Sequence, residues 1–165
     1  MFGLRGLLLA AWLIAVPTWA DTLHGVVIVV IDGDTVLFKP DHYGTDSRAF
    51  MKVRLAEIDA PEKDQPGGEA ATRGLAAMVL KQPVEIQTVA TDTYGRSIAQ
   101  LQQGALQVNV EMVRMGLAWV ATRGRDKPAL DDALDEARRA KRGIWMNADP
   151  TPPWVWRRGR NASAH

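Results

Sequence analysis

The feature that most limits how this chain can fold is a series of short segments with strand character, separated by turn signals. Valine and isoleucine dominate the first segment, and apolar residues alternate with polar ones in several others, which is the pattern of half-buried strands. The segments span residues 23–31, 35–38, 50–55, 84–90 and 97–101. Five short strands in one small chain predict a closed Greek-key barrel of the OB type.

Helical patterns interrupt this series after the third strand and follow it after the fifth. Apolar residues recur at helical spacing in 69–81. Asn109 is expected to cap a short helix that runs through Met115. Residues 128–142 carry acidic side chains at their start and basic ones at their end, which suits the helix dipole. The predicted fold class is therefore α+β: a five-stranded OB-fold Greek-key β-barrel with three α-helices.

Residues 1–20 are predicted to form a secretory signal peptide. Arg5 supplies a positive charge, residues 6–16 are apolar but too few to span a bilayer as a stable anchor, and Ala20 ends a stretch suited to signal peptidase. An uncleaved membrane anchor is the alternative. We expect a signal peptide at 1–20, one domain at 21–148, and an extended Pro-, Trp- and Arg-rich tail at 149–165. After cleavage the protein would lie in the periplasm or outside the cell, with no membrane attachment.

The composition excludes some chemistry and leaves little net charge. The chain has no cysteine, so neither disulfides nor thiolate chemistry can contribute. The whole chain has 20 basic and 19 acidic residues, and Arg5 is the only charged residue in 1–20, so 19 of each remain after the predicted cleavage. Because non-specific nucleic-acid binders usually carry a large positive balance, any nucleic-acid contact here must rely on locally concentrated basic side chains.

Three segments, 32–35, 54–62 and 92–96, supply acidic and basic side chains in the combination that phosphodiester hydrolysis needs. Asp34 opens the second strand and Asp59 follows the third, and neighbouring strands bring such ends close to a shared ion. Carboxylate oxygens, together with a backbone carbonyl and water, form a typical shell for calcium. Glu62 is left over to activate water.

Two arginines complete this set. Arg54 lies in the third strand, and Arg96 follows a Tyr-Gly turn. A guanidinium group can hold two phosphate oxygens at once and can stabilise the charge that grows on phosphate in the transition state. Taken singly, each of these acidic and basic side chains has an ordinary explanation as a turn residue or a solvated surface group. All of them in order on one short chain predict a metal-dependent phosphodiesterase.

These residues resemble the staphylococcal nuclease (thermonuclease) family over most of the chain, from about His24 to Trp145. The matching segments are 31–35, 54–55, 59–62, 92–99, 108–109, 113–118 and 143–145. The resemblance implies an OB-fold barrel with three helices. It also implies a calcium-dependent endonuclease that cuts DNA and RNA with little sequence preference and leaves 3′-phosphate and 5′-hydroxyl ends. We further expect a monomer that favours single-stranded or unwound regions.

The resemblance also implies how a cation and a water molecule are held. Asp34 and Asp59 match the family's calcium carboxylates. The backbone carbonyl of Ala60 matches a third ligand; the family usually has threonine there, and a main-chain ligand tolerates alanine. One calcium ion is expected, with other divalent metals as alternatives. Glu62 matches the carboxylate that orients or deprotonates the attacking water.

Two arginines and a tyrosine match the family's substrate contacts. Arg54 and Arg96 match the two phosphate-binding arginines, and Tyr94 matches a residue that contacts the phosphate end of the nucleotide. Arg54, Glu62 and Arg96 are therefore the expected catalytic residues.

The chain departs from the family's archetype at three places. The archetype has a longer, lysine-rich loop after its active-site glutamate, where this chain has only residues 61–68. Thr93 stands where the archetype has a lysine. Two tyrosines that flank the nucleotide are replaced by Thr122 and Gly124, in a stretch that also holds Arg123 and Arg125. These departures bear on affinity and substrate preference, and none of them touches the chemical step.

Two other readings of the sequence are compatible with an OB barrel. The first is a non-catalytic nucleic-acid-binding protein, because OB barrels often bind strands without cutting them. The second is an envelope protein that binds a partner through its tryptophan-rich tail. Chelator-sensitive cutting of nucleic acid would select the enzyme, retardation without cutting would select the binding protein, and neither behaviour would select the envelope protein.

Overall fold

The computed structural model describes residues 22–121 and 127–163. The predicted signal peptide and the positions Thr122, Arg123, Gly124 and Arg125 lie outside the described residues. Within the described ranges, no helix combines the length and the apolar character that a bilayer crossing requires.

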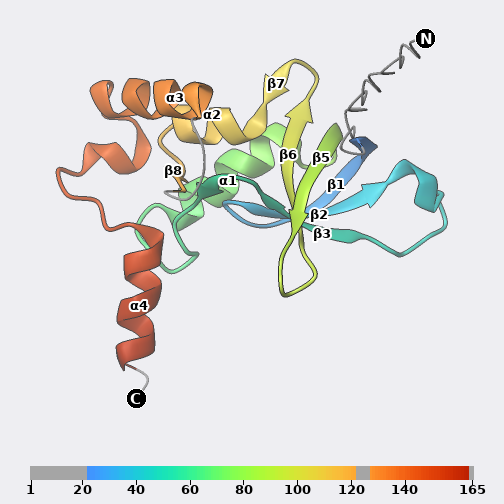
Figure 1. The fold of residues 1–165 in the computed structure, drawn as a ribbon, viewed down its shortest axis with the longest axis horizontal. Coiled ribbons are helices and arrows are strands. Elements are labelled where there is room, and N and C mark those ends of the chain that lie inside the picture. The colour runs from blue at the N-terminus through green and yellow to red at the C-terminus, as the bar shows by residue number, and fades with distance from the viewer. Residues whose placement is uncertain (1–21, 122–126, 164–165) are drawn as a thin grey trace, which may run out of the picture.

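Five strands form the closed barrel that the sequence predicts. They are β1 (Thr22–Asp32), β2 (Thr35–Pro40), β3 (Met51–Leu55), β5 (Pro83–Thr91) and β6 (Ser97–Gln103). Neighbours pair in the order β3-β2-β1-β5-β6, and β3 also pairs in parallel with β6, which closes the sheet (Figure 1). The short strand β7 (Leu106–Gln107) extends β6, and β4 (Ile58–Asp59) pairs with β8 (Trp119–Val120). The predicted α+β class and OB-type barrel are confirmed.

Three α-helices lie close to their predicted ranges: α1 (Gly68–Val79), α2 (Val108–Arg114) and α3 (Pro128–Arg139). Short 3₁₀ helices, η1 (Asp41–Tyr43) and η2 (Gly143–Met146), lie in connecting segments. The described residues also contain a fourth helix, α4 (Pro153–Ser163), which projects from the body of the molecule (Figure 1). The expected extended tail and the count of three helices are therefore wrong. Pro153 is the first residue of this helix. The first N–H groups of a helix have no partner within it, so proline loses no hydrogen bond at this position.

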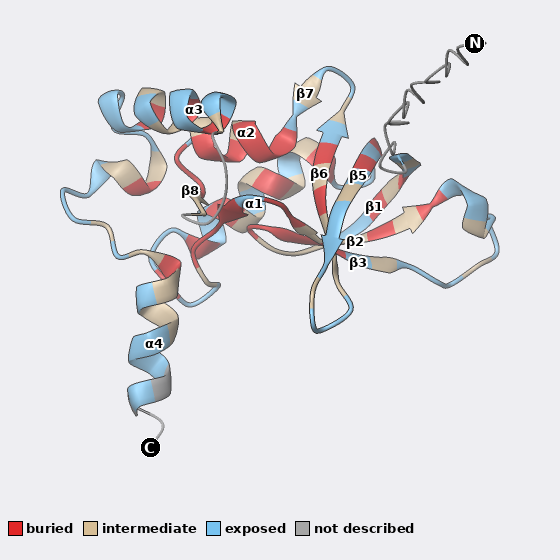
Figure 2. Cartoon of the chain, in the orientation of Figure 1, coloured by how far each residue is buried: buried red, intermediate tan, exposed pale blue. Residues whose placement is uncertain are grey.

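The hydrophobic core fills the barrel and continues against the buried faces of α1 and α2 (Figure 2). Its largest buried side chains include Phe38, Leu55, Leu75, Ile86 and Met112. By contrast, the outer turns of α4 are exposed wherever they are described. The barrel is thus a rigid platform, and α4 is an appendage with little core of its own.

Asn109 has a different role from the predicted helix cap. It lies inside α2 and is buried; its Nδ2 donates to the carbonyl oxygens of Ala56 at 2.9 Å and Ala99 at 3.2 Å, and its Oδ1 accepts from Leu101 N at 2.9 Å. The cap prediction is wrong because the side chain instead satisfies backbone groups of the barrel that would otherwise be buried without partners.

Candidate active site

The turn between β1 and β2 places Asp34 on the barrel wall. The register pairs Asp32 with Thr35, which leaves two residues in the turn. Asp34 N donates to Asp32 Oδ1 at 3.1 Å, and Asp34 O accepts from Leu55 N at 2.8 Å. These hydrogen bonds fix Asp34 against β3, and Asp34 is only 3% exposed.

Gly33 allows this turn to pack closely on its neighbours. A Cβ atom at Gly33 would lie 2.6 Å from Ala71 Cβ in α1 and 2.7 Å from Ala60 Cβ. Both distances are well below ordinary contact, so any larger residue would push the turn outward. The glycine is needed here for space, and it holds Asp34 close to the segment that follows β4.

Arg54 joins the two predicted cation carboxylates in one cluster. Its Nη1 lies 2.7 Å from Asp34 Oδ1, and its Nη2 lies 3.0 Å from Asp59 Oδ1. Asp34 Oδ2 accepts a hydrogen bond from Ala60 N at 3.0 Å. Asp59 is also buried, at 6% exposure. The neighbouring strand ends thus bring Asp34 and Asp59 together, as the sequence predicts.

The burial of these acids has an electrostatic cost. Burial, opposed by the Arg54 guanidinium and aided by the charge of Asp32, raises the pKa of Asp34 to about 6. Two buried carboxylates on one wall therefore attract positive charge strongly. An acid in a cleft whose pKa is raised, as that of Asp34 is, is typical of functional sites.

Glu62 is held by a residue that the sequence analysis did not single out. Arg157, from α4, places its Nη1 2.7 Å from Glu62 Oε1 and 3.1 Å from Asp59 Oδ1, while its Nη2 lies 2.7 Å from Asp59 Oδ2. The hydrogen bonds to Asp59 and Glu62 raise the pKa of Arg157 further above its usual range, so it is always charged. The sequence signal that could have indicated α4 is the run without proline that follows Pro153.

Arg96 and Tyr94 lie on the turn between β5 and β6, where Asp92 orders the backbone. Asp92 Oδ1 accepts from Tyr94 N and Arg96 N at 2.9 Å each, and Asp92 Oδ2 lies 2.6 Å from Arg96 Nε. The Arg96 guanidinium carbon lies 5.7 Å from the centroid of the Tyr94 ring, which is cation–π range. Asp92 thus aims the arginine while the tyrosine, 84% exposed, remains free for contact.

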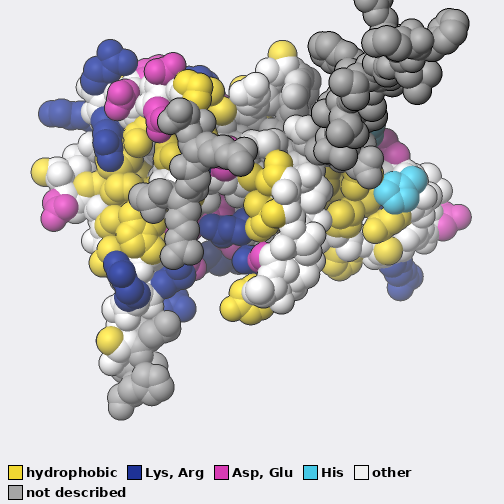
Figure 3. Space-filling view, viewed as in Figure 1, with side chains coloured by type: hydrophobic (Ala, Val, Ile, Leu, Met, Phe, Trp, Pro, Cys, Tyr) yellow, Lys and Arg dark blue, Asp and Glu magenta, His cyan; other side chains and the backbone are white. Residues whose placement is uncertain are grey.

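One cavity of about 720 Å³ joins these elements. Asp34, Arg54, Ala60, Glu62, Tyr94 and Arg96 line it, and Arg157 and Arg160 of α4 also face it. In the space-filling view, Lys and Arg side chains gather where α4 leaves the body (Figure 3). Four arginines and Lys63 line this cavity together with four acidic residues, so basic side chains are concentrated here but most of their charge is balanced.

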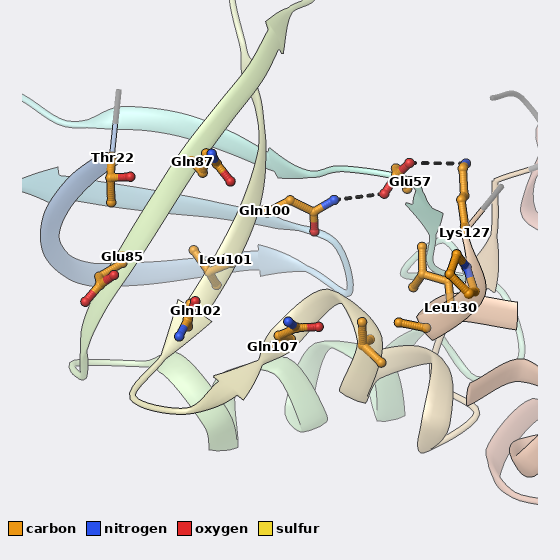
Figure 4. A pocket seen from close by; sticks show the side chains of 13 residues that line it. Thr22, Glu57, Glu85, Gln87, Gln100, Leu101, Gln102, Gln107, Lys127 and Leu130 are labelled. Carbon is orange, nitrogen blue, oxygen red and sulfur yellow. Dashed lines mark hydrogen bonds and ion pairs between the residues drawn. The ribbon is translucent and has the colours of Figure 1, made fainter. Parts of the chain in front are cut away.

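A second cavity, of about 360 Å³, lies on another part of the barrel wall and contains none of the predicted site residues. Its polar lining comes largely from glutamines of β5 and β6 (Figure 4). Glu57 accepts a hydrogen bond from Gln100 Nε2 at 2.9 Å and lies 3.6 Å from Lys127 Nζ. Because Glu57 and Lys127 are paired with each other, we do not assign this cavity to the chemistry.

The donor set at Asp34 and Asp59 fits a hard divalent cation. No group of three or more His, Cys, Asp or Glu side chains within 22–121 and 127–163 is arranged to hold a metal. Two carboxylates and the backbone carbonyl of Ala60 are nevertheless all oxygen donors, and water can complete such a shell for calcium. The ligand roles of these three residues, and the catalytic roles of Arg54, Glu62 and Arg96, remain predictions.

The fold and the site define an OB-type barrel whose wall carries buried aspartates beside arginines suited to phosphate. The family model described as "Staphylococcal nuclease homologue" matches residues 52–147, more than half of the chain. The chain belongs to the staphylococcal nuclease homologue family, as the resemblance indicated. The matched segment contains Arg54, Asp59, Glu62 and Arg96 and ends before α4.

Curated relatives share most of the chain. A protein of Escherichia coli O157:H7 named "Uncharacterized endonuclease" is 39% identical, covering 86% of this chain and 89% of the relative. A "Micrococcal nuclease" of Shigella flexneri is 36% identical, covering 92% of this chain and 90% of its own length. "Protein ParB" of Escherichia coli is 37% identical, covering 93% and 89%.

Proposed function

We propose that the protein is a calcium-dependent endonuclease that hydrolyses phosphodiester bonds of DNA and RNA without sequence preference and leaves 3′-phosphate and 5′-hydroxyl ends. The observation that carries the proposal is the cluster of Asp34, Arg54 and Asp59, in which Asp34 and Arg54 line the same cavity as Arg96. Membership of a nuclease family, and relatives named endonuclease or micrococcal nuclease, support the same activity.

Three residues would hold the cation: Asp34 and Asp59 through their carboxylates, and Ala60 through its carbonyl. A bound calcium ion would supply a positive charge that polarises the phosphate being attacked. The aspartates contribute by being held in place before the ion arrives, because Asp34 is fixed through its backbone and both lie in the barrel wall.

Arg54 and Arg96 bind the phosphate from different sides of the cavity. Arg54 is fixed by two aspartates, and Arg96 is fixed by Asp92. Both guanidinium groups are oriented before substrate binds, so they can stabilise the added charge of the five-coordinate phosphorus without reorganising. Tyr94 contacts the phosphate end of the nucleotide from the cavity rim.

Glu62 orients the attacking water and takes its proton. Its side chain is 32% exposed, so water reaches it from the cavity. Attack proceeds in line on phosphorus, and the 5′-oxygen leaves with its electron pair and a proton from solvent. The scheme needs no residue from a second copy, and we propose that the protein acts as a monomer.

We also propose that the protein works in the periplasm or outside the cell and prefers single-stranded or unwound nucleic acid. The signal-peptide pattern in residues 1–20 supports the location. The open cavity supports the preference, because a splayed strand brings its phosphates to a barrel wall more readily than a duplex does.

The test is incubation of purified full-length protein with plasmid DNA and with RNA, first with calcium and then with an excess of chelator. We expect both substrates to be cut with calcium and neither with chelator, and end-labelling should show 3′-phosphates. Equal cutting in chelator would refute the cation requirement. Retardation without cutting would show a binding protein instead.

A further inference from the structure

A cation from the protein itself occupies the acidic groups that the proposed function assigns to calcium and to water. The Arg157 guanidinium spans Asp59 and Glu62 through three contacts of 2.7–3.1 Å. We propose that α4 is an intramolecular inhibitor, in which Arg157 competes with the divalent cation for Asp59 and with water for Glu62. This inference rests on the proposed function and adds a regulatory element to the same site.

The hydrogen bonds on Asp59 show why the two cations exclude each other. Asp59 Oδ1 already accepts from both Arg54 and Arg157, and Asp59 Oδ2 accepts from Arg157. A carboxylate offers about four lone-pair positions in total, and Arg157 takes two of those in use. A calcium ion that bound Asp59 would also meet the guanidinium charge at close range. Arg157 must therefore leave before the ion can be held well.

Arg157 affects the water position as well. Its Nη1 lies 2.7 Å from Glu62 Oε1, so an N–H takes one lone pair of this oxygen and competes with water for the carboxylate. Arg96, in contrast, is held by Asp92, which lies outside the acidic cluster. Arg157 thus occupies acidic groups that the reaction needs, whereas Arg96 occupies none of them and can bind phosphate.

The attachment of α4 is weak enough to be reversed. Near its start, the Trp154 ring packs on Trp119 with centroids 5.6 Å apart, and Gln65 Nε2 donates to Thr151 O at 2.6 Å. Further along, Arg160 pairs with Asp64 at 2.8 Å, and both side chains are more than half exposed. Exposed ion pairs contribute little, and the outer turns of α4 are exposed where they are described, so the helix can detach locally while the barrel stays folded.

Calcium affinity is the direct test, with Arg157→Gln compared with Arg158→Gln in the full-length protein. Arg158 is exposed and outside the cluster, so its variant removes the same charge without freeing Asp59. Calorimetric titration should show calcium binding about tenfold tighter in Arg157→Gln, and unchanged within about twofold in Arg158→Gln. Arg157→Lys, which keeps the charge but loses the planar fork, should fall between wild type and Arg157→Gln.

Linkage supplies a second readout that does not depend on activity. If Arg157 and calcium exclude each other, calcium must loosen α4 to the same degree that Arg157 weakens calcium binding. Hydrogen exchange of residues 153–163 should therefore speed up on adding calcium to the wild type, and change little in Arg157→Gln. Unchanged or slower exchange in the wild type would contradict the proposal.

The outcomes separate this inference from the proposed function. If the wild type binds calcium and cuts nucleic acid, but Arg157→Gln binds calcium equally or more weakly, the inhibitor is refuted and the nuclease stands. If Arg157→Gln cuts more slowly at saturating calcium, Arg157 is a substrate contact and the inference also fails. If the wild type neither binds calcium nor cuts, the proposed function fails and the inference fails with it.

Discussion

The two sides of the cavity are built in different ways. The barrel side consists of Asp34, Arg54 and Asp59 at adjacent strand ends, where half-buried Arg54 pairs with both buried aspartates. The peripheral side, formed by a loop, a hairpin turn and a terminal helix, carries residues that are more exposed: Glu62, Tyr94, Arg96 and Arg157. The fold therefore fixes the barrel side, which we propose binds the cation. Residues of the peripheral side, which we propose contact phosphate and water, can be substituted without disturbing the core.

Arg54→Ala should have the largest effect, because this residue belongs to both the chemistry and the barrel side. Loss of a charge-stabilising donor should lower the rate about 100- to 1,000-fold. It also leaves buried Asp34 without its cation, which should lower the free energy of unfolding by about 3 kcal/mol. Steady-state kinetics and urea unfolding would measure the two effects. A fully active variant, or a variant as stable as wild type, would break the comparison.

Arg96→Ala should separate the two sides. It should lower the rate by a similar factor of about 100. Its pair with Asp92 lies on a hairpin turn outside the core, so the free energy of unfolding should change by no more than about 1 kcal/mol. The same kinetic and urea measurements apply. Destabilisation as large as that of Arg54→Ala would show that the hairpin is part of the rigid half.

Asp34→Asn should reveal the cost of burying charge on the barrel side. Burial raises the pKa of Asp34 from its ordinary 3.8 to about 6. The folded state therefore binds a proton on Asp34 more tightly than the unfolded state does. Protonated Asp34 contributes its whole stabilising free energy below about pH 4, and this contribution is lost as the pH rises through 6. Asparagine does not titrate. In chelator, the stability of Asp34→Asn relative to wild type should therefore rise by up to about 3 kcal/mol between pH 4 and 7.

Urea unfolding at several pH values measures this difference. Asp92→Asn, on the exposed hairpin, is the control that should not show the same rise, because hydrogen bonds from Arg96 and Tyr94 lower the pKa of Asp92 rather than raising it. A difference for Asp34→Asn that falls with pH would mean that Arg54 outweighs the cost of burial.

Tyr94→Ala should have the smallest effect, because the side chain is mostly exposed and contacts Arg96 through its ring face. We expect KM for a short oligonucleotide to rise about three- to tenfold, with kcat changed less and stability unchanged within about 0.5 kcal/mol. A loss of kcat as large as that of Arg96→Ala would place the tyrosine in the chemical step.

The barrel side could be predicted from the sequence because short-range patterns along the chain determine it. Strand alternation and the turn at Gly33 fix where Asp34 and Asp59 end up, and short strands in order leave few barrel arrangements. Arg157 could not be found this way, since its partners Asp59 and Glu62 lie 98 and 95 residues earlier in the chain. Asn109 was misread for the same reason: its partners come from the barrel, while a capping pattern considers only its own helix.

Calcium titration of the wild type and of Asp59→Asn, followed by calorimetry, tests the central claim most directly. Asp59 is shared by Arg54 and Arg157 and is the proposed point of contact between the cation and both arginines. The account predicts one saturable site in the wild type, lost or weakened at least about 100-fold in Asp59→Asn, with cleavage of nucleic acid falling in parallel. Equal calcium binding and equal cleavage by the two proteins would contradict it.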